Sequence, residues 1–322
     1  MPTHKEPISV VWLKRDLRLD DNEAIQKALV SGNHVLLFYV FEPMLLNDPH
    51  YNERHWNFIK QSLEDMNERL VQFNTKVLTM QTDMMSAFNK IQTHFKVVNV
   101  FSHQETGILV TFNRDKIFKR FCKNNFINWQ ENINNGIYRG LQNREQWVEN
   151  WERFMNMPLC EFQPKAKQFL SFEDITILEQ ECQTVSLSTL KTSSFQKGGT
   201  TIGLKYLESF LNNRYKNYMF SISKPLDARK SCSRLSPYLA WGNLSVRQVL
   251  NRHWLWMFPH QTKSNWKPFC PDSSGRPILF KSSKWNTPWK RKVSIKGIMT
   301  LEKTCLNSIK RLGKLEKLVY PW

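Results

Sequence analysis

The sequence predicts an α/β protein, in which an N-terminal doubly wound parallel five-stranded sheet is followed by a long linker and then by the start of an all-α domain. Short apolar, β-branched runs alternate with amphipathic helical patterns over residues 1–130, which is typical of parallel strands with helices on both faces. Residues 131–198 are a mixture of Asn-rich, Ser/Thr-rich and Pro-containing pieces, typical of a connection. From Gly198 to Arg252 the apolar spacing is helical.

Five apolar segments are the expected strands, because buried parallel strands are continuous runs of Val, Ile, Leu and aromatic residues. In chain order they are residues 8–13, 34–40, 76–80, 97–101 and 126–129. Apolar residues spaced three and four apart predict helices between them, at 22–30, 53–73, 84–95 and 112–123. Asp20 or Asp21 is a suitable N-cap for the first of these helices.

Composition places the chain among globular proteins, with 41% hydrophobic and 23% charged residues. No apolar run reaches the length that spans a membrane, and the N-terminus has no apolar signal segment. We therefore expect an intracellular protein, cytoplasmic or nuclear, with no membrane partner. Six scattered cysteines without a C-x-x-C pair predict free thiols, a reducing compartment and no metal site.

The net charge of +18 favours a nucleic-acid partner, but it is unevenly distributed. Residues 253–322 hold 14 Lys or Arg and 3 Asp or Glu, a net charge of +11. Residues 1–252 therefore carry only +7. Any binding of nucleic acid through charge alone is expected mainly from the C-terminal segment.

A charged segment follows the first expected strand and contains Lys14, Arg15, Asp16 and Arg18. Ligands of doubly wound sheets bind beyond the carboxyl ends of the strands, so these side chains are candidates for a ligand site. The alternative is a solvated charged loop.

A second candidate site begins at Cys232, within the helical region. Ser233 and Ser236 offer hydroxyl groups, and Arg234 offers a planar fork of donors suited to phosphate. Pro237 suits a first helical turn, for which Ser236 would be the cap, and a helix N-terminus of this kind can bind a diphosphate. The alternative is an ordinary capped helix with a surface arginine.

Four segments, in this order, resemble the photolyase/cryptochrome family. They are Trp12–Asn22, Ser102–Gly107, the Gly-rich helix Gly199–Arg214, and Cys232–Arg247, which is the most specific. The resemblance extends from residue 7 to about residue 250. It implies an antenna domain, FAD as cofactor, and an antenna pigment of the folate or deazaflavin type.

The resemblance also implies site residues. Cys232, Ser233, Arg234, Leu235 and Ser236 match the family's flavin-phosphate loop, with Cys232 standing where the family usually has Thr or Ser. Tyr218 corresponds to a flavin-contacting tyrosine, with nearby Tyr215 as the alternative. In photolyases the light-excited reduced flavin donates an electron to a pyrimidine dimer in DNA, and in cryptochromes light is signalled to partner proteins. The choice between repair and signalling stays open, and no catalytic residue is assigned.

Residues 253–322 do not resemble the family. They hold six of the twelve tryptophans, have poor helical periodicity, and lack the family's Trp…His-Phe, Glu-x-Glu and Gly-Lys-Thr-Gly segments. Shifting the reading frame permits all three segments in the expected order, with Glu forced wherever Trp266, Trp285 and Trp289 precede Lys or Asn. We interpret this segment as a frame-shifted tail; the alternative is a divergent basic tail.

The expected organisation is therefore an antenna domain (1–130), a linker (131–198), a partial all-α FAD-binding domain (199–252) and an aberrant tail (253–322). A chain that lacks most of the flavin pocket is expected to be inactive as given. Two alternatives stay open. One is a non-enzymatic α/β module that binds a nucleotide or pigment, and the other is a nucleic-acid-binding protein that acts through its basic tail.

Overall fold

The computed structural model describes residues 5–139, 146–180, 195–221 and 224–257. These residues form two compact units. The first comprises described residues within Met1–Ile202 together with Trp241–Gln248, and the second comprises those within Gly203–Ala240 and Val249–Trp322. Among the described helices, none combines the length and the hydropathy needed to cross a lipid bilayer.

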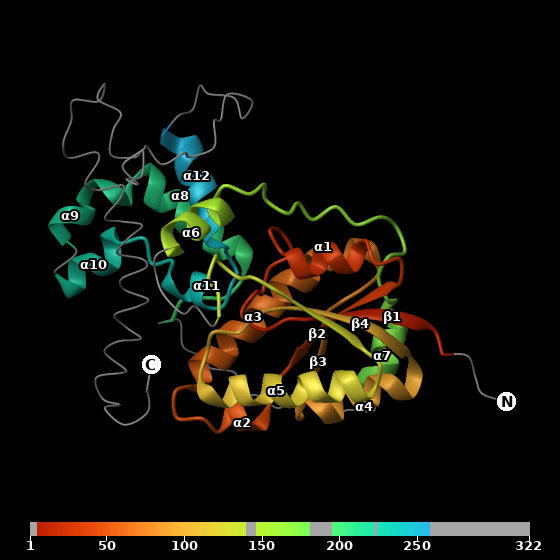
Figure 1. Ribbon diagram of the computed structural model, residues 1–322. Helices are drawn as coiled ribbons and strands as arrows, with labels where there is room; N and C mark the ends of the chain where they lie inside the picture. Colours follow the sequence, from red (N-terminus) through yellow and green to blue (C-terminus); the bar gives the residue numbers. More distant parts are fainter. Residues whose placement is uncertain (1–4, 140–145, 181–194, 222–223, 258–322) are drawn as a thin grey trace. The chain divides into compact units, whose positions relative to one another are not determined.

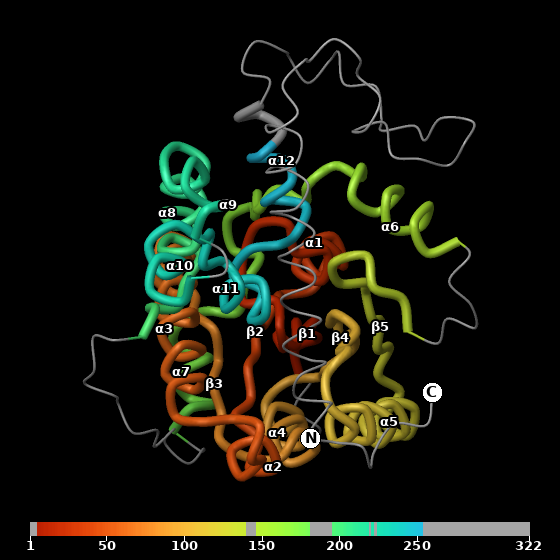
Figure 2. The backbone as a smooth tube through the Cα atoms, turned by 90° about the vertical axis from the view of Figure 1, so that its left-hand side faces the viewer, coloured from red at the N-terminus to blue at the C-terminus, as the bar shows by residue number. Residues whose placement is uncertain are grey.

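The first unit contains a five-stranded sheet in the order β3-β2-β1-β4-β5, with every neighbouring pair parallel (Figure 2). The predicted fold class is therefore confirmed. The strands are β1 (Pro7–Trp12), β2 (His34–Val40), β3 (Leu78–Met80), β4 (Lys96–His103) and β5 (Asn128–Asn132). The second strand matches its prediction at both ends, whereas the fifth lies further along the chain than residues 126–129.

Helices cover both faces of this sheet (Figure 1). Helices α1 (Glu23–Leu29) and α3 (Glu53–Leu70) lie on one face, and α4 (Met84–His94) and α5 (Leu109–Asn124) lie on the other. A short helix α2 (Pro43–Leu46) and a 3-10 turn (Val71–Phe73) complete these crossovers. Trp12, Phe88 and Phe118 pack edge to face within the core, with ring centroids 5.0 Å and 4.8 Å apart.

Part of the predicted linker is built into this core. Helices α6 (Trp147–Met155) and α7 (Phe172–Gln180) lie in the linker, and Leu170, Ile175 and Leu178 are buried in the cluster beneath the sheet. The amide of Leu170 donates to the carbonyl of Val35 on β2 at 3.0 Å. The polar composition of this segment does not reveal these contacts, because only a few apolar side chains of the segment are buried in the core.

The cap of α1 differs from its prediction. The side chain of Asn22, rather than Asp20 or Asp21, accepts from the amide of Ile25. Asp21 has a left-handed backbone (φ 53°), and its carboxylate is directed to partners far along the chain.

The second unit is helical, as predicted. Its elements are most of α8 (Thr200–Asn212), a 3-10 turn (Arg214–Asn217), α9 (Tyr218–Ser221), α10 (Pro225–Ser231), α11 (Ser236–Ala240) and the end of α12 (Val246–Met257). Helix α11 begins at Ser236, so the residue predicted as its cap is its first helical residue. With only five residues, α11 provides little of the dipole on which the predicted helix-terminal phosphate site depends.

Candidate functional site

The first candidate site lies where the connections from the sheet diverge. Strands β1 and β4 are neighbours, and the chain leaves their carboxyl ends toward opposite faces. This is the topological switch point at which doubly wound proteins bind their ligands. The charged loop that contains Lys14, Arg15, Asp16 and Arg18 follows β1 here, and Gln104 and Glu105 follow β4, as the sequence predicts.

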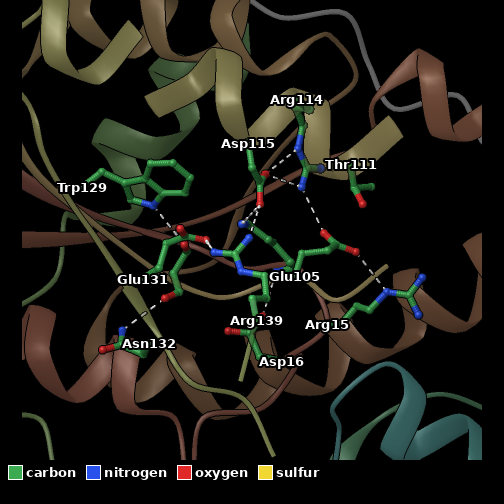
Figure 3. A network of polar contacts seen from close by, with 12 residues as sticks. Arg15, Asp16, Glu105, Thr111, Arg114, Asp115, Trp129, Glu131, Asn132 and Arg139 are labelled. Atoms are coloured by element: carbon green, nitrogen blue, oxygen red, sulfur yellow. Dashed lines mark hydrogen bonds and ion pairs between the residues drawn. The ribbon is translucent and has the colours of Figure 1, made fainter. Parts of the chain in front are cut away.

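Arg114 of α5 is the centre of a network of ion pairs at this point (Figure 3). Its guanidinium lies 2.5 Å from Glu42, 3.0 Å from Glu105 and 2.9 Å from Asp115, measured between nitrogen and carboxylate oxygen. All four side chains are almost completely buried. Its guanidinium also lies 4.6 Å from the centroid of the Trp12 ring.

Two cations of the β1 loop join the same network. Lys14 Nζ lies 3.2 Å from Asp115 Oδ2, and Arg15 Nε lies 3.2 Å from Glu105 Oε1. The other end of the Arg15 fork donates to the hydroxyl of Tyr51 at 2.7 Å. Arg139 closes the outer side through Glu131 at 2.5 Å. Sequence reasoning found Lys14 and Arg15 but missed Glu42, Arg114 and Asp115, which no local motif marks.

The pKa values within the network show mutual stabilisation. Burial opposes the charge of Arg114, but the nearby carboxylates outweigh burial and raise its pKa. Burial likewise opposes the charge of Glu105, and Arg114 and Arg15 outweigh it, so the pKa of Glu105 is lowered. The pKa of Lys14 is lowered because burial outweighs the attraction of Asp115. These charged side chains pair with one another, as expected of a network that stabilises the fold.

Two buried acceptors beside the network do not share this pairing. Gln104 Oε1 and Asn134 Oδ1 have no hydrogen-bond partner in the described part of the chain. The unpaired oxygens suit a ligand that offers N–H or O–H donors, whereas the charged groups are already neutralised within the protein.

The end of the family-like segment Cys232–Arg247 belongs to the α/β unit. The carboxylate of Asp21 accepts from Arg247 Nη2 at 2.6 Å and from Arg247 Nε at 3.2 Å, and it also pairs with the hydroxyl of Ser245. Arg18 donates to the carbonyl of Gly242 at 2.9 Å, and Asn243 donates to that of Leu17 at 2.9 Å. We call this group of buried contacts the Asp21 clasp. These contacts join the segment Trp241–Gln248 to the α/β unit, and the predicted domain boundary at residue 199 stays a prediction.

The second candidate site is the loop Cys232–Ser236 in the helical unit. Ser233 and Leu235 are buried, Cys232 and Arg234 are half-buried, and Ser236 is exposed. Arg234 has a left-handed backbone with φ 58°. Burial raises the pKa of the Cys232 thiol, so this side chain stays a neutral, weak donor.

Tyr218, predicted to contact the flavin, is also buried in this unit. It packs edge-on against Phe210 of α8, with ring centroids 5.9 Å apart. Its prediction as a flavin contact stays a prediction, and so does the neighbouring alternative, Tyr215.

The loop contains buried backbone donors. In the part of the chain that the structure describes, no backbone carbonyl pairs with the backbone amides of Ser233 and Leu235. Buried backbone donors are almost always paired, so these groups point to a ligand rich in acceptor oxygens. A flavin diphosphate fits that requirement.

Comparison with known proteins finds similarity to photolyases and cryptochromes. Residues 9–135 match the family model described as DNA photolyase. A cryptochrome DASH of Idiomarina loihiensis is 22% identical over 250 residues, which cover 74% of this chain and 54% of the relative.

Two solved structures share the fold. A cryptochrome from Synechocystis has a TM-score of 0.60 at 19% identity and covers 81% of this chain and 58% of its own. An archaeal photolyase from Sulfolobus tokodaii, solved with two FAD molecules, has a TM-score of 0.56 at 18% identity, with 76% and 54% covered. The chain therefore spans little more than half the length of these three proteins.

Proposed function

We propose that the chain is a photolyase/cryptochrome-type flavoprotein that binds FAD, because residues 9–135 match the DNA photolyase family model and the relatives it matches include cryptochromes. The observation that carries the proposal is the loop Cys232–Ser236, where the backbone amides of the buried residues Ser233 and Leu235 pair with no backbone carbonyl of the described residues. The solved photolyase with two FAD molecules supports FAD as the ligand.

Bound and reduced FAD, excited by blue light, supplies an electron for transfer. The chain's own contribution is to hold the diphosphate at Ser233–Leu235 and to keep this segment away from water. The electron acceptor would be a pyrimidine dimer in DNA, or the excitation would be signalled to a protein partner. Relatives named photolyase and cryptochrome both occur among the matches, which leaves DNA as a proposed partner.

We further propose that the chain as given is inactive because residues 253–322 are read out of frame. The support is the sequence itself: half of the tryptophans, a net charge of +11, and a shifted frame that permits three family segments in order. Sequencing genomic DNA across codons 251–262 tests this. An insertion or deletion there is the expected result, and an uninterrupted frame overturns it.

The flavin proposal is tested on the purified full-length chain. We expect flavin absorbance after reconstitution with FAD. We also expect the bound flavin to be reduced under blue light in the presence of an electron donor. A folded chain that stays colourless after reconstitution contradicts the proposal.

A second candidate function is a non-enzymatic α/β module that binds a pigment or nucleotide. The observation in its favour is the pair of unpaired acceptors, Gln104 Oε1 and Asn134 Oδ1, at the switch point. A folate or deazaflavin that binds while FAD does not would support this function. A third candidate, binding of nucleic acid by the basic tail, predicts salt-sensitive DNA binding that disappears when residues 253–322 are deleted.

A further inference from the structure

Helix α5 presents a strip of positive charge on the outside of the α/β unit. The helix covers one face of the sheet next to the edge strand β5 (Figure 2). Its exposed side carries four cations and one aromatic ring, spaced three or four residues apart, and we call this set the α5 basic strip. The set is Phe112, Lys116, Lys119, Arg120 and Lys123. Side chains at this spacing lie on one side of a helix, over a length of about 17 Å.

The cations of the α5 basic strip are not neutralised by the chain itself. None of them forms an ion pair with a carboxylate of the described residues. Lys116 instead places its Nζ atom 4.2 Å from the centroid of the Phe112 ring. The one acidic residue of α5, Asp115, is buried and pairs with cations of the interior. An anionic partner that spans the strip would relieve the repulsion among these like charges.

The strip ends beside an exposed phenylalanine in a strained backbone conformation. Helix α5 closes in a Schellman motif, in which the amide of Ile127 donates to the carbonyl of Cys122 at 2.9 Å and the amide of Phe126 donates to that of Lys123 at 3.4 Å. This motif needs a left-handed residue, usually Gly, and Phe126 takes the position with a φ of 55°. Phe126 is also 95% exposed.

The exposed ring has no structural explanation in the described residues. A bulky side chain in the left-handed region raises the energy of the turn, and Phe126 offsets none of this cost by burying apolar surface. Strain that the fold does not need is typical of functional sites. Lys96 is exposed at the start of β4, and its strand runs parallel to β5, which begins just after Phe126, so a further cation lies at this end of the sheet.

Charge and aromatic ring together indicate the chemistry of the partner. A nucleic-acid strand carries one phosphate for each base, so it offers anions to the cations and a flat π-face to the ring. A duplex keeps its bases stacked on one another, whereas a single strand leaves them free to stack on an aromatic side chain. An acidic peptide or an anionic lipid surface matches the cations but gives no reason for an isolated ring held out in water.

We propose that the α5 basic strip and Phe126 form a binding surface for single-stranded nucleic acid. The cations contact the phosphates, and the Phe126 ring stacks on an unpaired base. The surface lies within the α/β unit and shares no residue with the loop Cys232–Ser236 or with the basic segment 253–322. It requires neither flavin nor light, and it is insensitive to sequence, because every base has a π-face.

The first test measures the charge of the strip. A fluorescent single-stranded oligothymidylate is titrated with the full chain in the dark, and its anisotropy is followed at several salt concentrations. Lys119→Gln should lower the slope of log K against log salt by about 0.7, the value for one phosphate contact on a single strand. Lys60→Gln is the matched control, because it removes the same charge from an exposed position on α3 and should leave the slope unchanged. Both variants keep residues 253–322, so any binding by that segment is the same in each.

The second test separates binding from folding. Gly is the residue that the Schellman position favours, so Phe126→Gly should unfold at a higher urea concentration than wild type. The same variant should bind oligothymidylate about fivefold more weakly or worse, because the stacked base is lost. An oligonucleotide without bases keeps the phosphates, and its affinity should not change. Phe126→Trp should retain binding, whereas Phe126→Leu, which keeps the apolar character without the ring, should not.

The outcomes that overturn the proposal are specific. One is an equal change of the salt slope in Lys119→Gln and Lys60→Gln. Another is a Phe126→Gly variant that binds oligothymidylate as wild type does, or that weakens the base-free oligonucleotide equally. Duplex DNA with the same dependence on Phe126, or phosphatidylserine vesicles that bind through Lys119 while oligothymidylate does not, would assign the surface to another partner. Since FAD takes no part in these measurements, failure of the flavin proposal leaves this one standing.

Discussion

Replacing Asp21 by Asn tests whether the segment Trp241–Gln248 is fastened to the α/β unit by a buried charge. Asp21 is 1% exposed and Arg247 6% exposed at the side chain, and two hydrogen bonds join them at 2.6 and 3.2 Å. The side chain of Asn has nearly the same shape as that of Asp, and Asn also tolerates the left-handed backbone at this position. The substitution therefore measures the effect of removing the negative charge alone. Removing one partner of a buried pair costs about 3–5 kcal/mol, because the other charge stays buried and uncompensated.

The neighbouring residue provides a matched control. Asp20 pairs with Arg69 at 2.7 Å, but these side chains are 39% and 35% exposed. An exposed pair contributes about 0–1 kcal/mol, so Asp20→Asn should change little. The assay is urea unfolding followed by tryptophan fluorescence, together with hydrogen exchange of the amides of residues 241–248. Equal effects of the two substitutions, or unchanged exchange in Asp21→Asn, would refute the clasp.

Three further predictions concern the same α/β unit. Gly242→Ala should destabilise it by about 3 kcal/mol or more in urea unfolding, because φ is +73° and the new Cβ would lie 2.1 Å from the carbonyl oxygen of Arg15. Gly32→Ala, with φ +82° and nothing within 4 Å, should cost only about 1 kcal/mol, and equal costs would contradict the close approach at Gly242. Cys122, whose pKa burial raises to about 12, should not react with a disulfide reagent at about pH 8 until the chain is unfolded; rapid reaction of the native protein would show that it is accessible. Glu105→Gln should cost about 2 kcal/mol near pH 7. Because the pKa of Glu105 is lowered in the folded state, its contribution to stability is complete above the unfolded pKa of about 4.3 and is lost as pH falls through the folded pKa. The difference in free energy of unfolding between wild type and Glu105→Gln should therefore shrink on acidification. A difference that stays constant would contradict the pairing.

Local pattern predicts the strands well and the long-range partners poorly. Strand β2 is predicted to the residue, because a short continuous apolar run bounded by polar residues seldom adopts a structure other than a buried strand. Asp21 looks like a helix cap, but it pairs with Arg247 far along the chain, and Asn22 caps the helix instead. No spacing rule in a sequence connects two such residues.

The candidate sites show the same division. The motif Cys232–Ser236 predicts a phosphate loop, which stays a prediction, whereas the bonds of Arg214 to the loop carbonyls become visible only in the structure. Likewise, Arg114 is an ordinary helix residue in sequence, and only the folded sheet brings Glu42 and Glu105 to it from the connections that follow β2 and β4. Leu170 and Ile175 likewise enter the core from a polar stretch, and their sequence context does not mark them as core residues.

The most direct test of the flavoprotein assignment is equilibrium dialysis of the purified full-length chain against FAD and, separately, riboflavin. Our account predicts saturable binding of FAD that inorganic pyrophosphate displaces, with riboflavin bound more weakly. The account would be contradicted if a chain that is folded by circular dichroism binds no FAD at an FAD concentration about 100 times a typical micromolar dissociation constant.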